Sequence, residues 1–210
     1  MQEIPSREAI QASLENRHTK AIQDKLTNAR VCICGLGGLG SAIAIALARV
    51  GVGHLHLIDF DCVDLSNVNR QHYALDEIGM TKTEALAREI RRFSPYIDLQ
   101  LTNQKITEEN YREILQDETF ICEAFDKAEE KAMLTNLVLE NFPKKFLVGA
   151  SGMAGYGDSN AIKTKKITSH YYLCGDMSSG IENGLGLMAP RVMLCAAHQA
   201  NKIVELILNN

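Results

Sequence analysis

The chain has 210 residues, of which 46% are hydrophobic and 23% are charged, and its formal net charge at pH 7 is −4. This length predicts one domain with a modest extension, and this composition is typical of a globular protein with a substantial core. The acidic balance argues against a broad nucleic-acid surface, although a local phosphate pocket needs only a few cations.

The first residues do not have the pattern of a targeting segment. They carry Glu3, Arg7 and Glu8 with no apolar core behind them, so we expect no signal peptide. The apolar stretch 31–58 is cut by glycines and by Arg49, which favours strand–helix–strand over a membrane span. The chain is therefore expected to be cytoplasmic and to have no membrane or nucleic-acid partner.

Strand and helix patterns alternate along the first part of the chain. A polar helical arm is predicted over 5–28 and a short buried strand at 31–34, and further strands are predicted at 54–58, 98–102, 120–122 and 146–150. Helices are predicted at 41–50, 82–93, 108–115 and 128–141. This alternation predicts an α/β fold with a doubly wound, mostly parallel, Rossmann-like sheet.

After Gly152 the pattern changes to short polar segments punctuated by glycine, which suit hairpins. They predict a small antiparallel C-terminal extension, a loop of Gly, Ser and Met over 175–189, and a last helix from Pro190 to about residue 208. The expected organisation is a helical N-terminal arm over 1–28 and a single nucleotide-binding domain over 29–210.

Six cysteines occur, and none forms the C-x-x-C pairs of a zinc site: Cys32, Cys34, Cys62, Cys122, Cys174 and Cys195. We predict reduced, mostly buried thiols and no zinc. Cys174 lies in the polar segment 172–175 and is the best candidate for a sulfur or acyl link, beside the simpler interpretation of a structural thiol.

A glycine-rich turn separates the first predicted strand from the following helix. Residues 35–40 read Gly-Leu-Gly-Gly-Leu-Gly, which places glycines at Gly35, Gly37, Gly38 and Gly40. Such a turn lets backbone N–H groups approach a phosphate, and the N-terminus of the following helix favours an anion there. The alternative is a glycine turn that only packs helix on strand.

Three carboxylates follow the predicted strands. Asp59 ends the second strand, where an acidic side chain commonly accepts hydrogen bonds from ribose hydroxyls, and this role suits adenosine and NAD alike. Asp61 lies two residues on and either faces the same side or is a solvated loop carboxylate. Asp126 follows the fourth strand, where it is either a Mg²⁺ ligand beside a triphosphate or a helix N-cap.

Residues 66–71 read Ser-Asn-Val-Asn-Arg-Gln and bring a cation and amides towards the same crevice. The Arg70 guanidinium can hold two phosphate oxygens and neutralise developing charge. Asn67 and Gln71 can fix that arginine or the phosphate chain. Lys82 adds a second cation at a helix N-terminus, where the positive helix end makes an anionic partner favourable.

At these residues the sequence resembles the ThiF/MoeB/HesA family, the bacterial relatives of ubiquitin-activating enzymes. The elements that carry the resemblance occur in order: the glycine turn 35–40, Asp59-Phe60-Asp61, segment 66–71, Gly79-Met80-Thr81-Lys82 and Asp126. The short length and the ending 187–191 (Leu-Met-Ala-Pro-Arg) look most like the compact ThiF-type proteins linked to thiamine biosynthesis.

The resemblance implies an ATP-dependent adenylyltransferase. In that family ATP and Mg²⁺ activate the C-terminal glycine carboxylate of a small ubiquitin-like carrier, here a ThiS-like sulfur carrier with a Gly-Gly terminus. By resemblance, Asp59 binds ribose and Asp126 binds Mg²⁺. Arg70 and Lys82 bind the phosphates, with Asn67 ordering them.

Arg17, in Asn16-Arg17-His18, resembles an arginine finger that enters the site of a neighbouring subunit, which implies a homodimer. Two departures stand out: the zinc-binding C-x-x-C pairs of larger members are missing, and Lys127 follows Asp126 where the family usually has Asn.

Three other functions remain open at this point. An NAD(P) oxidoreductase explains the glycine turn and Asp59 but leaves Arg70 and Lys82 without a role. A non-catalytic scaffold is disfavoured because Arg70, Lys82 and Asp126 are all present. Adenylation of another acceptor, a tRNA-base carboxylate or a peptide, keeps the chemistry and changes the substrate.

Overall fold

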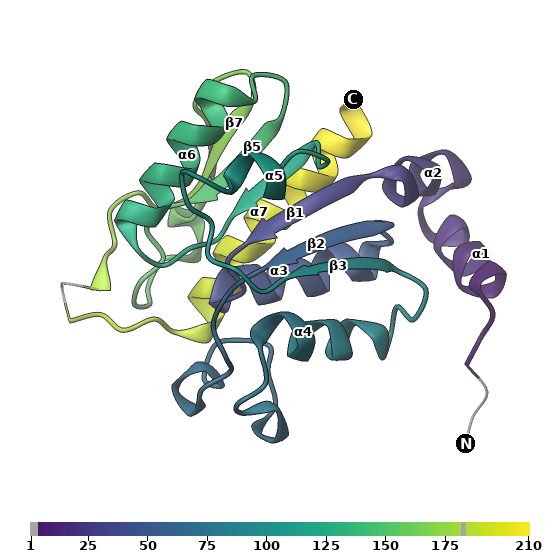
Figure 1. The fold of residues 1–210 in the computed structure, drawn as a ribbon, viewed down its shortest axis with the longest axis horizontal. Helices are drawn as coiled ribbons and strands as arrows, with labels where there is room; N and C mark the ends of the chain where they lie inside the picture. The colour runs from purple at the N-terminus through teal and green to yellow at the C-terminus, as the bar shows by residue number, and fades with distance from the viewer. Residues whose placement is uncertain (1–3, 182–183) are drawn as a thin grey trace.

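The structure, a computed structural model, describes residues 4–181 and 184–210. Its centre is a seven-stranded sheet with the strand order β3-β2-β1-β4-β5-β7-β6 (Figure 1). The strands are β1 Arg30–Cys34, β2 His54–Ile58, β3 Asp98–Thr102, β4 Phe120–Glu123, β5 Phe146–Ala150, β6 Lys163–Lys166 and β7 Tyr171–Gly175. Every neighbouring pair is parallel except β6 with β7. The predicted mostly parallel, doubly wound sheet is thereby confirmed.

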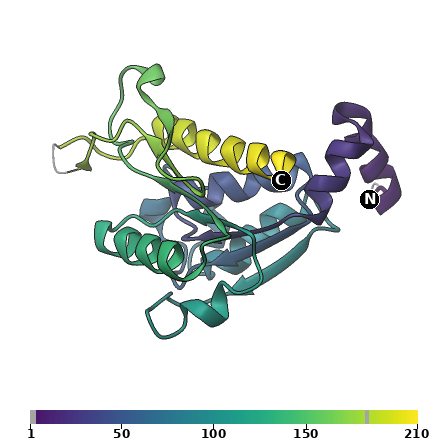
Figure 2. The ribbon, with the colours of Figure 1, turned by 90° about the horizontal axis from the view of Figure 1, so that it is seen from above.

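Helices cover both faces of this sheet. They are α1 Arg7–His18, α2 Lys20–Asn28, α3 Gly38–Val50, α4 Lys82–Arg91, α5 Tyr111–Ile114, α6 Ala128–Asn141 and α7 Ala189–Asn209. Figures 1 and 2 show α3, α4 and α7 on one face and α5 and α6 on the other. None of the helices in the described part of the chain is long and apolar enough to cross a membrane.

The main core lies between the sheet and the two helices α3 and α7. Aliphatic residues of β1 and β2 meet Ile43 and Leu47 of α3 and Ile203 of α7, all fully buried. Truncating such a leucine to alanine costs about 2–5 kcal/mol. The core thus fixes α3, and with it the glycine turn, against the end of β1.

The N-terminal arm is broken into two helices at Thr19. This residue has φ +75° and ends α1, and its hydroxyl oxygen accepts a hydrogen bond from the N–H of Ile22 at the start of α2. No residue of α1 is buried. Both helices lie beyond the amino ends of the strands (Figure 1).

The predicted antiparallel extension joins the main sheet. β6 and β7 form the antiparallel pair, and β7 also pairs in parallel with β5. Gly175 ends β7 with φ +134°, and a Cβ there would overlap the carbonyl oxygen of Ser151. The segments that follow β5 and β7 are therefore in direct contact.

Candidate functional site

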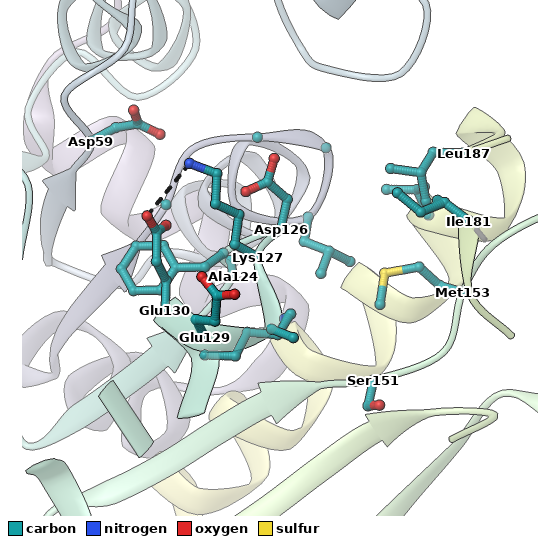
Figure 3. Close-up of a pocket in the computed structure, with 18 of the residues that line it drawn as sticks. Asp59, Ala124, Asp126, Lys127, Glu129, Glu130, Ser151, Met153, Ile181 and Leu187 are labelled. Atoms are coloured by element: carbon teal, nitrogen blue, oxygen red, sulfur yellow. Dashed lines mark ion pairs between the residues drawn. The ribbon is translucent and has the colours of Figure 1, made fainter. Parts of the chain in front are cut away.

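A cavity of about 1100 Å³ opens at the carboxyl ends of the central strands. We call it the carboxyl-edge pocket; its walls are the segments after β1, β2, β3, β4 and β5, together with 177–181, Leu187 and Val192. Neighbouring strands β1 and β4 lie where the strand order reverses, which is where ligands bind in such sheets. Figure 3 shows Asp59, Lys127 and Glu130 across the pocket from Met153, Ile181 and Leu187.

Most of the predicted site residues meet in this pocket. Those that line it are Gly35, Gly37, Gly38, Asp59, Asp61, Arg70, Gln71, Lys82 and Asp126. Gly40, Asn67 and Arg17 do not belong to its wall.

The glycine turn is held in contact with the turn after β4. Gly35 has φ +92°, and a Cβ there would lie 2.9 Å from both the Ala124 carbonyl oxygen and Phe125 Cδ1. A Cβ on Gly40 would overlap the carbonyl oxygen of Gly35, so Gly40 permits close packing of α3 on the turn. Gly37 is the N-cap of α3 and offers no side-chain cap, so the first N–H groups of the helix suit an anion.

Asp59 fixes the glycine turn through its carboxylate. Oδ2 accepts a hydrogen bond from Leu36 N at 2.6 Å, and Oδ1 accepts one from Asp61 N at 2.8 Å. Burial raises the pKa of Asp59, and the Lys82 ammonium partly offsets that rise. A carboxylate oxygen has a second lone pair, so Asp59 can also accept from a ribose hydroxyl.

Lys82 is the first residue of α4, and it is almost fully buried. Its Nζ donates to Asp61 Oδ2 at 2.8 Å and lies 4.0 Å from Asp59 Oδ2. The two carboxylates offset the unfavourable position of a cation at a helix N-terminus. They also hold the ammonium at the pocket wall.

Arg70 and Gln71 reach the pocket from the segment that crosses over α3. Arg70 Nη1 donates to Ser66 O and to Asn69 Oδ1, both at 2.9 Å, which holds the guanidinium in place. Gln71 is 9% exposed, and its Oε1 has no hydrogen-bond partner in the described chain. An unpaired buried acceptor costs about 1–3 kcal/mol, so this site favours a ligand or water that donates.

Asn67 closes a short 3-10 turn, Leu65–Asn67, instead of reaching the pocket. Its Oδ1 accepts a hydrogen bond from Asp64 N at 3.0 Å, while Asp64 Oδ1 accepts one from Ser66 N at 2.8 Å. Asn67 thus shapes the segment that presents Arg70.

Asp126 is exposed in the turn after β4, and within the described chain it pairs with no cation. The N-cap of α6 is Lys127, so Asp126 does not have the cap role. Mg²⁺ binds one or two carboxylates together with phosphate oxygens and waters, and this carboxylate fits that donor set. No group of three or more His, Cys, Asp or Glu among residues 4–181 and 184–210 is arranged for a metal, so phosphate oxygens would have to complete the shell.

The wall opposite the glycine turn depends on a buried ion pair that the sequence did not reveal. Arg191 Nη2 donates to Asp176 Oδ2 at 2.6 Å, and Asp176 Oδ1 accepts from Ser178 N and Ser179 N at 2.9 and 2.8 Å. Burial alone would raise the pKa of Asp176, but the N–H groups of Ser179 and Ser178 and the Arg191 guanidinium hold it well below its ordinary value. The turn 176–179 is thereby tied to α7.

Arg17 and Cys174 lie outside the pocket of their own chain. Arg17 is exposed on α1, at the opposite end of the sheet (Figure 1). Cys174 is fully buried in β7 with its Sγ 3.4 Å from Thr164 Oγ1, and burial raises the pKa of its thiol. This setting favours the structural-thiol interpretation.

The fold and the pocket define a Rossmann-like α/β protein with a crevice at its switch point that a glycine turn and several charged side chains line. Residues 9–210 match the model of the ThiF family, and the chain belongs to that family.

Individual relatives differ in their names and in how much of them is matched. The chain is 37% identical over 113 residues to molybdopterin-synthase adenylyltransferase from Haemophilus influenzae, covering 53% of this chain and 46% of that protein. It is 35% identical over 146 residues to tRNA threonylcarbamoyladenosine dehydratase from Escherichia coli, covering 69% and 53%. The chain thus spans about half the length of these curated relatives.

Solved structures share the fold over nearly the whole chain. The crystal structure of E. coli tRNA N6-threonylcarbamoyladenosine dehydratase in complex with ATP matches with a TM-score of 0.86 at 23% identity, covering 99% of this chain and 98% of that one. E. coli MccB matches with a TM-score of 0.70 at 22% identity, covering 90% and 57%.

Proposed function

We propose that this protein is an ATP-dependent adenylyltransferase that activates the C-terminal glycine carboxylate of a small ubiquitin-like carrier protein and releases pyrophosphate. The observation that carries the proposal is the meeting of Arg70, Lys82 and Asp126 with the glycine turn in one pocket. Membership of the ThiF family supports it, as do relatives named adenylyltransferases and a structural neighbour that binds ATP.

The proposed reaction depends on positioning the carboxylate and ATP rather than on proton transfer. A carboxylate is already a nucleophile at neutral pH, so its attack on the α-phosphorus of ATP needs no general base. The protein must bring two anions together and offset their repulsion. Backbone N–H groups at Gly37 and the start of α3, with the Arg70 guanidinium, supply that offset.

The other residues complete the nucleotide site. Asp59 accepts from the ribose hydroxyls, and Asp61 holds Lys82 beside the phosphates. Asp126 would hold Mg²⁺, and that ion would supply neutralisation of phosphate charge when bound. The unpaired Oε1 of Gln71 accepts a hydrogen bond from the ligand or its water.

The carrier tail fits the wall that faces the glycine turn. Met153, Ala154 and Leu187 line it and offer an uncharged surface to an extended chain that ends in Gly-Gly. The likeness to compact ThiF-type proteins supports a ThiS-like sulfur carrier and a role in thiamine biosynthesis. Of the loop 175–189, positions 182–183 lie outside the described residues.

The active form proposed is a homodimer in which Arg17 serves the partner's pocket. Arg17 is exposed and far from its own pocket, as such a role requires. Mixing Arg17→Ala subunits with Arg70→Ala subunits tests this, because a mixed dimer retains one pocket with both arginines intact. Activity above that of either variant alone is expected, and no gain on mixing contradicts the role in trans.

A tRNA-base carboxylate is a second candidate acceptor, favoured by the match to tRNA threonylcarbamoyladenosine dehydratase over 69% of the chain. ATP–pyrophosphate exchange, measured with a Gly-Gly carrier or with tRNA, separates the two acceptors. Exchange that depends on the carrier is expected. A protein that binds NAD but not ATP would be an oxidoreductase, and one that folds without binding ATP would be a scaffold.

A further inference from the structure

A buried ion pair lies beneath the carboxyl-edge pocket. Lys131, in α6, donates from Nζ to Glu123 Oε1 at 3.0 Å, to Glu123 Oε2 at 3.1 Å and to Ala150 O at 3.0 Å. Glu123 is the last residue of β4 and is 2% exposed. All three ammonium protons have an acceptor, so Lys131 has no donor left for a phosphate.

The same carboxylate controls the turn that carries Asp126. Glu123 Oε1 also accepts a hydrogen bond from Phe125 N at 2.8 Å, across the residue that follows β4. Asp126 comes next in the chain, and the Ala124–Phe125 segment is the one that Gly35 contacts. The orientation of the Glu123 carboxylate therefore sets the direction of Asp126.

Lys131 also fixes the opposite wall of the pocket. Its bond to Ala150 O holds the last residue of β5, and Ser151 to Ala154 continue from there along the wall. A Cβ on Gly149 would lie 3.2 Å from Glu123 Oε2, so β5 leaves just enough space for the carboxylate. One ammonium group thus joins the ends of two strands whose extensions face each other across the pocket.

The position of this lysine is unfavourable for the helix alone. It lies in the first turn of α6, where the helix dipole opposes a cation. Burial raises the pKa of Glu123, and the Lys131 ammonium opposes that rise. A buried pair of this kind is a weak source of net stability, because desolvation offsets much of the attraction. The main contribution of the Glu123–Lys131 pair is therefore expected to be the geometry that it imposes on the ends of β4 and β5.

We propose that Lys131 is a positioning residue for nucleotide activation: by orienting the Glu123 carboxylate it aims Asp126, and so sets how strongly Mg²⁺ tightens the binding of ATP. The inference deepens the proposed function and rests on it for the catalytic consequence. Its binding consequence is measured without any carrier protein.

The test compares four variants of the full chain with the wild type. Lys131→Met removes the ammonium, and Lys131→Arg keeps a cation that can hold the carboxylate. Glu123→Gln/Lys131→Met makes the pair neutral, and Lys202→Met is the matched control. Lys202 pairs with Glu205 at 2.6 Å, its side chain is 15% exposed, and it lies outside the pocket.

Three quantities are measured for each variant: the melting temperature, the rate of ATP–pyrophosphate exchange, and the Kd of ATP by titration calorimetry with and without Mg²⁺. In Lys131→Met we expect exchange to fall about 100-fold, because a displacement of about 1 Å costs that much. We also expect Mg²⁺ no longer to lower the Kd of ATP, while the Kd measured without Mg²⁺ stays close to that of the wild type. In Lys131→Arg and Lys202→Met, Mg²⁺ is expected to lower the Kd of ATP as in the wild type, and the rate of exchange is expected to be retained.

The double variant separates positioning from stability. Because it carries no uncompensated buried carboxylate, its melting temperature is expected to return towards that of the wild type, while exchange and the Mg²⁺ effect remain low. If the melting temperature, the exchange rate and the Mg²⁺ effect on the Kd of ATP all recovered together, the ion pair would have only a structural role and the inference would be overturned. So would a folded Lys131→Met protein with an unchanged Mg²⁺ effect, or a wild type whose ATP binding ignores Mg²⁺. A wild type that shows the Mg²⁺ effect but no exchange with any acceptor refutes the proposed function alone.

Discussion

Replacing Gly35 with alanine tests whether contact between the glycine turn and the turn after β4 builds the pocket. Gly79 is a matched control, because its φ of +90° is almost that of Gly35 at +92°, while no atom lies within 4 Å of its added Cβ. An L-residue in left-handed backbone costs about 1–2 kcal/mol at either position. At Gly35 the Cβ also meets Ala124 O and Phe125 Cδ1 at 2.9 Å, and overpacking adds about 1–3 kcal/mol.

Urea denaturation measures the free energy of unfolding of both variants. Gly79→Ala is expected to lose about 1–2 kcal/mol and Gly35→Ala about 2–5 kcal/mol, because only the second must also displace its neighbours. Gly35→Ala is further expected to weaken ATP binding, because the displaced segment leads into Asp126. Equal losses of stability in the two variants, or unchanged ATP affinity in Gly35→Ala, would refute the contact as the reason for glycine at position 35.

Three further predictions concern single side chains. Arg70→Ala is expected to lower ATP–pyrophosphate exchange by about 100–1000-fold while leaving the melting temperature unchanged, since the proposed role of the guanidinium is to meet the developing phosphate charge; retained exchange rejects this role. Tyr73→Phe removes the hydrogen bond from Tyr73 Oη to Leu36 O at 2.8 Å and is expected to cost about 1 kcal/mol in urea denaturation; no loss means that water replaces the phenol. The folded-state pKa of Asp176 lies below the ordinary 3.8, so its stabilisation is present above that pH and is lost on acidification towards the folded pKa. Asp176→Asn is therefore expected to lower stability at pH 7 and to flatten the acid limb of a pH–stability curve; identical curves for variant and wild type contradict it.

The central strands of this fold could be predicted from the sequence because β1, β2, β4 and β5 are short runs of mostly apolar residues. Predicted strands 54–58, 98–102 and 146–150 coincide with β2, β3 and β5, and helix 128–141 coincides with α6. The carboxyl ends of parallel strands share an edge, so residues just after strands were expected to meet. For Gly35, Asp59 and Asp126 that expectation is confirmed.

Features that depend on side-chain contacts between distant segments were not predictable in this way. The break at Thr19 has no glycine or proline to mark it, yet the residue adopts φ +75°. Asn67 and Gln71 occupy one short motif, but only the structure shows that Asn67 caps a turn while Gln71 enters the pocket. Glu123 ends an apolar strand without any partner nearby in sequence, since Lys131 reaches it from the next helix.

The charge balance of the pocket indicates that binding the proposed triphosphate needs more positive charge than this chain's own lysines supply. The lysines at its wall are held by carboxylates: Lys82 by Asp61, Lys105 and Lys127 by Glu130, and Lys131 by Glu123. Among the described lining residues Arg70 is the cation whose hydrogen bonds go to neutral oxygens, so its positive charge is uncompensated. The added charge must come from outside these pairs, and the proposed sources are Mg²⁺ on Asp126 and Arg17 of a second subunit. The carboxylates thus hold the lysines in fixed positions before ATP binds, and the remaining positive charge is added when the proposed complex assembles.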